Sequence, residues 1–148
     1  MACQNIRIEC LRETACDLDL NAFAGDQKVG WATAEVSGSR VQLCDIHVRD
    51  DVTPPRSAFI RLLSPAMRRD IQSYRGQGIG GLLLRHLLRE ADAMAAEEVW
   101  GFVVQDDLSR SPFLLEWYGR HGFEVVAPDA ECMDGAVKKI ARRLNTCH

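Results

Sequence analysis

The chain has 148 residues, and its 18 Lys and Arg against 21 Asp and Glu give a net charge of −3 at pH 7. Hydrophobic residues make up 47% and charged residues 26%, which excludes a disordered chain and a coiled-coil or collagen-like rod. The size suits one hydrophobic core, so we predict a single domain over residues 1–148. Because the broad excess of Lys and Arg typical of nucleic-acid-binding proteins is missing, we expect no nucleic-acid partner.

The sequence also argues against membrane and metal partners. The longest apolar stretches, such as 99–104, are far shorter than the roughly 20 residues that span a bilayer, and residues 1–9 lack the pattern of a signal peptide. We therefore expect a cytoplasmic protein. The six cysteines include no C-x-x-C pair and the four histidines show no metal-ligand spacing, so we expect free thiols and no metal.

The first third of the chain has the pattern of an antiparallel meander. Its separators at 24–27 and 37–40 contain the Gly, Asp and Ser typical of tight turns. The expected strands are 6–12, 17–23, 28–36 and 41–48.

Residues 49–74 differ in composition. They contain Pro54 and Pro55, and from Ser57 onward their apolar residues follow a helical spacing that Pro65 interrupts. Between Arg56 and Arg75 five arginines stand against one acid. Such a run is either a solvated face or a surface that meets an anion, and we leave both interpretations open.

The second half alternates between helix and strand. Leucines three to four positions apart predict a helix over 79–96, and the unbroken apolar run 99–104 predicts a strand covered on both faces. Ser111 and Pro112 are typical of a helix start, with Gly122 as its end. A strand is expected at 123–126. The last segment has helical spacing, although a strand pairing back on 123–126 is also natural.

The segment 75–81 carries four glycines and leads directly into the leucine-rich helix. Glycine lets the backbone approach a ligand closely, and the free N–H groups of a first helical turn attract anions. The segment therefore suits phosphate or pyrophosphate. It matches neither G-x-x-x-x-G-K-[ST] nor the G-x-G-x-x-G fingerprint.

Three motifs together resemble the GNAT acyl-CoA N-acyltransferases. Residues 75–80, Arg-Gly-Gln-Gly-Ile-Gly, are similar to the family's [Q/R]-x-x-G-x-[G/A] signature. Residues 43–48 resemble its fourth strand, and 118–123 its Y-x-x-x-G-F motif. The motifs come in the family's order and cover about residues 41–126.

The resemblance implies an α/β (α+β) fold with a mixed, mostly antiparallel sheet, flanked by helices, whose fourth and fifth strands splay apart. Acetyl-CoA is the implied co-substrate, with its pantetheine arm in the gap. The implied cofactor-binding residues are Val48, Arg75, Gly76, Gln77, Gly78, Ile79, Gly80, Gly81 and Ser111. Ser111 stands where many relatives have an asparagine. For the last segment the resemblance implies a strand, against the helical spacing, and we expect a strand there.

The resemblance also implies the catalytic residues. Tyr118 would be the general acid that protonates the CoA thiolate, although it could be an ordinary helix residue. Asp45 is the first candidate for the general base or the amine anchor, and Glu35 and His47 are second candidates. Removal of the amine proton through water is the alternative. Cys44 stands where relatives often have an acid. Because Cys44 lies in an expected strand, we expect its thiol to be inert and packed rather than an acetyl acceptor.

The chain departs from the family in two further ways. No helices are expected between the first two strands, and residues 49–74 form an insertion. We hypothesise that 59–67 forms a wall of the acceptor pocket.

The expected function is N-acetylation of a small-molecule or peptide amine by direct transfer, with a homodimer possible. The alternatives are a non-catalytic CoA-binding or sensing module, or an interaction protein on the same fold.

Overall fold

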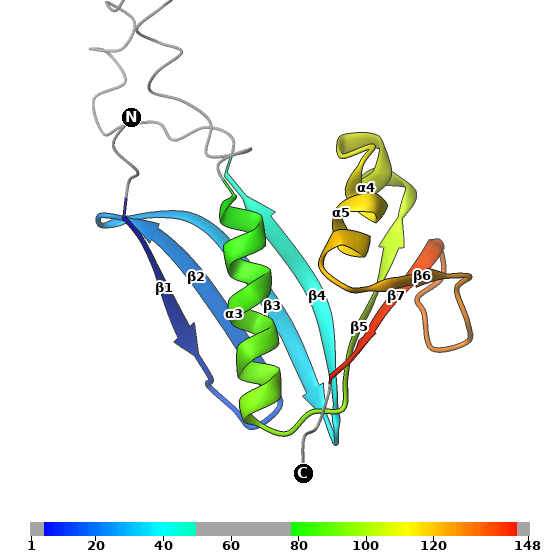
Figure 1. Ribbon diagram of the computed structural model, residues 1–148, viewed down its shortest axis with the longest axis horizontal. Coiled ribbons are helices and arrows are strands. Elements are labelled where there is room, and N and C mark those ends of the chain that lie inside the picture. The colour runs from blue at the N-terminus through cyan, green and yellow to red at the C-terminus, as the bar shows by residue number, and fades with distance from the viewer. Residues whose placement is uncertain (1–4, 50–77, 145–148) are drawn as a thin grey trace, which may run out of the picture.

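The computed structural model describes residues 5–49 and 78–144 (Figure 1). The predicted insertion at 49–74, apart from Arg49, lies outside the described residues, as do the proposed pocket wall at 59–67 and residues 75–77. The elements are β1 (Ile6–Leu11), β2 (Asp17–Ala24), β3 (Gln27–Ser37), β4 (Arg40–Val48), α3 (Ile79–Ala93), β5 (Glu98–Val104), α4 (Gln105–Arg110), α5 (Leu114–Arg120), β6 (Glu124–Val126) and β7 (Ala136–Arg143).

Within residues 5–49 and 78–144, seven strands form one mixed sheet in the order β1-β2-β3-β4-β5-β7-β6. All neighbours are antiparallel except β4 and β5, which are parallel. The predicted meander is confirmed, and its β2–β3 and β3–β4 turns contain Gly25 and Gly38 with φ of 62° and 60°. Residues 12–16 join β1 directly to β2, so the expectation of no helix there is also confirmed.

Helix α3 buries its leucine-rich side against the N-terminal half of the sheet (Figure 1). A Cβ on Gly30 of β3 would lie 3.3 Å from Leu83 and 3.4 Å from Ile79, so Gly30 points toward α3. Because side chains alternate along a strand, Ala32 and Ala34 share this face and are buried. The intervening side chain of Trp31 points to the opposite face of the sheet.

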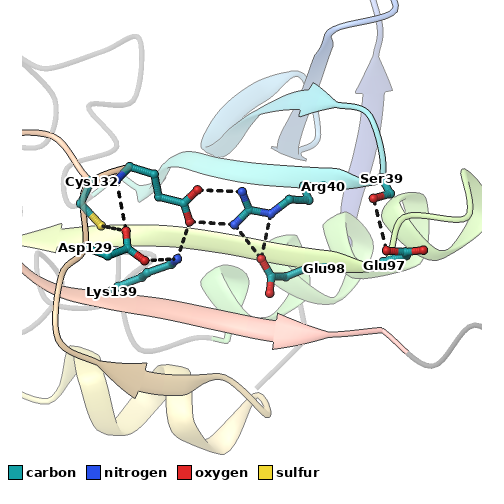
Figure 2. Close-up of polar contacts among 8 residues, drawn as sticks. Ser39, Arg40, Glu97, Glu98, Asp129, Cys132 and Lys139 are labelled. Carbon is teal, nitrogen blue, oxygen red and sulfur yellow. Dashed lines mark hydrogen bonds and ion pairs between the residues drawn. The ribbon is translucent and has the colours of Figure 1, made fainter.

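The loop between β6 and β7, residues 127–135, is tied to the sheet by ion pairs (Figure 2). Arg40 of β4 donates to Glu98 of β5 at 2.8 Å and to both oxygens of Glu131 at 2.7 and 2.8 Å. Lys139 of β7 bonds Glu131 as well, and Asp129 at 2.7 Å. The Arg40 and Lys139 charges lie 4.9 and 5.3 Å from the ring centroid of Trp100. The network therefore fixes this loop against the middle of the sheet.

The structure corrects one prediction in the second half and confirms another. The helix expected from Ser111 begins at Leu114, with Phe113 at its N-cap, and Ser111 ends the unpredicted helix α4 instead. The chain between the two helices is held by a backbone bond from Leu114 N–H to the Ser111 carbonyl. The last segment, where the spacing indicated a helix and the family resemblance a strand, is strand β7, as expected from the resemblance.

In the described part of the chain, no helix has the length and apolar character needed to cross a bilayer.

Candidate active site

The site lies where strands β4 and β5 diverge. The two strands pair over only three positions, of which Gln42 with Trp100 is the last. Just beyond, a Cβ on Gly101 would lie 3.0 Å from the carbonyl oxygen of Leu43. The absence of a side chain at Gly101 allows this close approach. Past this point β4 and β5 spread apart toward the end of the sheet at which α3 begins (Figure 1).

A cavity of about 1080 Å³ occupies this divergence. Its lining comes from β4, the start of α3, β5, the α4–α5 region and Ile140 of β7. The edge of β4 that faces β5 has no strand partner beyond Gln42 among the described residues. Its main-chain N–H and C=O groups are therefore available to a bound molecule that carries amide groups.

The first turn of α3 forms one end of the cavity. Gly78 is the N-cap residue and has φ of 78°, a left-handed conformation that glycine adopts without strain. The first helical N–H groups of the turn have no intrahelical partner. A Cβ on Gly80 would lie 3.6 Å from the ring of Trp117 and 3.7 Å from Val48, which places α5 beside this turn.

Cationic side chains contribute to the cavity and lie beside the first turn of α3. Arg110 of α4 and Arg120 of α5 contribute to the lining. The Arg85 guanidinium would lie 4.0 Å from a Cβ on Gly81. Burial lowers the pKa of His121, and the positive charges of Arg85, Arg120 and Arg142 lower it further. The helix N-terminus and these arginines together suit a ligand with several negative charges.

Tyr118 of α5 lines the cavity and is 5% exposed. Its ring packs edge-on against Trp117 and Phe123, with centroids 5.0 and 5.5 Å apart. Burial raises the pKa of the phenol above its ordinary value, and the charges of Asp107 and Asp45 raise it further. The hydroxyl has no hydrogen-bond partner among residues 5–49 and 78–144. Tyr118 therefore presents to the cavity a hydroxyl donor that no described residue accepts from.

A bulge in β4 directs Asp45 and His47 toward the face of the sheet opposite α3. Ala34 pairs with Leu43 and Thr33 with Asp45, so Cys44 is the extra residue between them. His47 then pairs with Trp31, which lies on that opposite face. Asp45 and His47 are exposed, and both line the cavity.

Cys44 differs from the expectation of a packed strand cysteine, because its position in the bulge leaves it exposed. Partial burial of its thiol group nevertheless raises the pKa of Cys44, and the negative charge of Glu35 raises this pKa further. Its Sγ lies 3.5 Å from the carbonyl oxygen of Gln42. A raised pKa reduces the thiolate fraction, so the thiol is a poor nucleophile.

The structure brings most of the predicted site residues to one cavity. These are Asp45, Val48, Gly78, Ile79, Gly80, Gly81, Ser111 and Tyr118. Arg75, Gly76 and Gln77 lie outside the described residues. The reserve candidate His47 also lines the cavity, whereas Glu35 does not. In the two described ranges, no group of three or more His, Cys, Asp or Glu side chains is placed to hold a metal ion.

Sequence reasoning missed several lining residues, namely Phe102, Asp107, Arg110, Trp117 and Arg120. Arg120 lies inside the Tyr118–Phe123 motif and could have been noticed as a charge beside it. Arg110 offered no such signal, because α4 was not expected.

No family model matches the sequence, and no curated protein matches it significantly. Solved structures do match its fold. The ribosomal-protein-S18-alanine N-acetyltransferase from Escherichia coli has a TM-score of 0.63 at 15% identity, covering 97% of both chains. The IAA acetyltransferase from Bacillus cereus has a TM-score of 0.61 at 15% identity, covering 95% of this chain and 100% of the other.

A third match is the PaiA N-acetyltransferase from Thermoplasma acidophilum in complex with coenzyme A, with a TM-score of 0.60 and 16% identity. The alignment covers 87% of this chain but spans only 62% of the length of the Thermoplasma protein. A matching acetyltransferase from Staphylococcus aureus is described as a member of the GNAT family. The chain has the GNAT fold, which confirms the resemblance at the level of architecture.

Proposed function

We propose that this protein is an acyl-CoA-dependent N-acyltransferase, most simply one that transfers acetyl from acetyl-CoA to an amine. The observation that carries the proposal is the cavity between β4 and β5, which Tyr118 and Asp45 line together with the first turn of α3. The fold is shared with N-acetyltransferases, one of which is in complex with coenzyme A.

In this proposal the cofactor binds with its phosphates at the wide end of the cavity. Main-chain N–H groups from Gly78 to Gly81 hold the pyrophosphate, with the helix dipole behind them. Arg110 and Arg120 neutralise its charge. The pantetheine amides pair with the unpartnered edge of β4 around Val48, and Ser111 borders the cofactor from the α4–α5 connection.

The transfer itself needs a neutral amine. Its nitrogen attacks the thioester carbonyl carbon and forms a C–N bond, and collapse of the tetrahedral intermediate breaks the C–S bond. The amine loses a proton, either to Asp45 or through water to solvent, and the CoA thiolate gains one. The products are an N-acetyl amine and free CoA thiol.

Tyr118 is the proposed donor to the departing sulfur. An ordinary phenol gives a proton to a thiolate at a cost of roughly 2 kcal/mol, and the raised pKa of Tyr118 increases this cost. The same raised pKa keeps the hydroxyl protonated across the physiological range. Tyr118 therefore acts first as a hydrogen-bond donor that stabilises negative charge on sulfur, and the proton follows as the bond breaks.

The direct route is preferred over an acetyl-cysteine intermediate because the pKa of Cys44 is raised.

The proposed acceptor is either a small amine or a peptide amine. The net charge of −3 favours a cationic acceptor through long-range attraction. The proposed compartment is the cytoplasm, and a homodimer is the simplest assembly.

The direct test combines calorimetric titration of the full chain with acetyl-CoA and a turnover screen. The screen uses pooled small amines and short peptides, and release of free CoA thiol is the readout. Binding together with turnover is expected. Binding without turnover on a broad panel would favour the CoA-sensing module, and absence of binding would exclude both.

A further inference from the structure

Three side chains form a connected cluster on the face of the sheet opposite α3. The indole Nε1–H of Trp31 donates to Oδ2 of Asp45 at 3.0 Å. The His47 ring stacks on Trp31 with centroids 4.5 Å apart. The Lys28 ammonium lies 5.2 Å from the Trp31 centroid. We call Trp31, Asp45 and His47 the open-face cluster.

The cluster holds one carboxylate oxygen and leaves the other available. Trp31 is directly opposite His47 in the β3–β4 register, so backbone pairing fixes their stack. Trp31 in turn fixes Oδ2 of Asp45. Oδ1 has no bond to any residue in the described ranges, and no described cation forms an ion pair with Asp45. Within the described part of the chain, the arrangement presents a fixed negative charge that has no cationic partner.

The cavity connects this charge to the proposed transfer site. Asp45 and His47 line the same cavity as Tyr118, a residue that is 5% exposed and whose hydroxyl has no partner among the described residues. Tyr118 belongs to α5, which packs beside the start of α3 on the other face of the sheet. The cavity is thus lined from both faces, with Tyr118 on one side and the open-face cluster on the other.

We infer that the open-face cluster is the acceptor subsite and that it binds a primary ammonium group at Oδ1 of Asp45. This inference rests on the proposed function. Alkylamines are protonated at neutral pH and are far stronger bases than carboxylates. Asp45 therefore holds the ammonium ion, and the proton leaves to water before the nitrogen attacks. His47 packs against the alkyl chain, and Trp31 is a positioning residue that orients Asp45.

The test uses the indole N–H resonances of the three tryptophans in the ¹⁵N-labelled full chain, with Trp31 assigned from its loss in Trp31→Phe. The wild type is titrated with pentylamine and, in parallel, with 1-pentanol, which has the same chain without a charge. We expect a saturable shift of the Trp31 resonance with pentylamine alone. Equal shifts with both compounds, or none with pentylamine, would overturn the inference.

Two variants locate the charge that matters. Asp45→Asn keeps an oxygen that can accept from Trp31 but removes the negative charge, and it should weaken pentylamine binding about fivefold, as for an exposed ion pair. Asp92→Asn removes one charge from the last turns of α3 and should leave binding unchanged. Equal weakening by both variants would mean that only net charge acts, which contradicts a local subsite.

A second measurement separates this inference from the proposed function. Addition of CoA should shift the Trp117 resonance, because that ring contacts the first turn of α3. If CoA has no effect while pentylamine shifts the Trp31 resonance, the proposed function fails and the cation subsite stands.

If CoA binds and amines are acetylated, Trp31→Phe should raise the KM for the amine several-fold and leave the KM for acetyl-CoA unchanged. An unchanged amine KM would remove Trp31 from the subsite.

Discussion

The carbonyl oxygen of Leu43 lies so close to Gly101 that a Cβ there would be 3.0 Å away. This contact joins β4 to β5 at the last point before they diverge. The two strands contribute eight of the 22 residues that line the cavity, from Leu43 to Val48 on β4 and Phe102 and Val103 on β5. The dimensions of the proposed binding site thus depend on the missing side chain at Gly101.

Substitution Gly101→Ala tests this dependence. The added methyl must push the Leu43 carbonyl away or deform β5, and we expect a loss of about 1–3 kcal/mol in the free energy of unfolding, as for an overpacked core. Affinity for acetyl-CoA should fall as well. Urea unfolding measures the stability, with Gly119→Ala in α5 as the control because a Cβ there meets nothing within 4 Å. Equal stability of both variants would contradict the tight contact.

Substitution Tyr118→Phe tests the proposed acid. The variant keeps the ring contacts with Trp117 and Phe123 and removes only the hydroxyl. We expect kcat to fall by about 10²–10⁴, the usual contribution of a positioned acid. The affinity for acetyl-CoA, measured by calorimetry, should be unchanged. A kcat equal to that of the wild type would remove Tyr118 from the mechanism.

Substitution Cys44→Ala tests the direct route. Because burial raises the pKa of the Cys44 thiol, we expect the variant to keep turnover. Mass spectrometry of the wild type after incubation with acetyl-CoA should detect no acetylated Cys44. A trapped acetyl-cysteine that transfers its acetyl group to an added amine would establish the two-step route instead.

The ion pairs of the β6–β7 loop predict a response to acid. Hydrogen bonds from Arg40 and Lys139 lower the pKa of Glu131 from 4.5 to about 2. A depressed carboxyl pKa stabilises the folded state above the unfolded-state value, and the contribution is lost as pH falls through the folded value. Stability at neutral pH should therefore exceed stability near pH 2 in part through Glu131.

Substitution Glu131→Gln isolates this contribution. The variant should be less stable than the wild type at neutral pH, and the gap should shrink as pH falls from about 4.5 to about 2. Chemical unfolding across this range measures it. Glu124→Gln on β6 is the control, because Glu124 has no ion pair with a described residue. A gap that does not change with pH would show that the charge of Glu131, paired with Arg40 and Lys139, adds nothing to stability.

The sequence predicted those parts of the fold that depend on local pattern. Alternation and turn chemistry located β1 to β4, and the leucine spacing located α3. Helix α4 could not be found this way, because none of its residues is buried and it has no apolar periodicity. Its start is instead held by a bond from the Val104 N–H to Asp107 at 3.1 Å.

The final segment shows where periodicity is ambiguous. Strand β7 lies between β5 and β6, and Ile140 pairs with Gly101 on one side and Val125 on the other. Each face of β7 carries both apolar and basic side chains, with Ile140 and Arg142 on one face and Lys139 and Ala141 on the other, so the strand has no simple alternation. The spacing of its apolar residues therefore resembles that of a helix, whereas the family resemblance indicates a strand.

The site was predictable where it is contiguous in the chain. The glycine turn and Tyr118 belong to short motifs, whereas the contact of Trp31 with Asp45 depends on the register of two strands. The bulge at Cys44 decides that register, since a slip of one residue would reverse the faces of Asp45 and His47. Neither the bulge nor the pairing is visible in a linear sequence.

The two-sided lining of the cavity has a kinetic consequence. If the phosphates enter beside α3 and α5 while the amine enters over Trp31 and His47, neither substrate blocks the path of the other. Binding would then occur in random order, and each product could leave on its own side. Free CoA would inhibit competitively against acetyl-CoA but not against the amine.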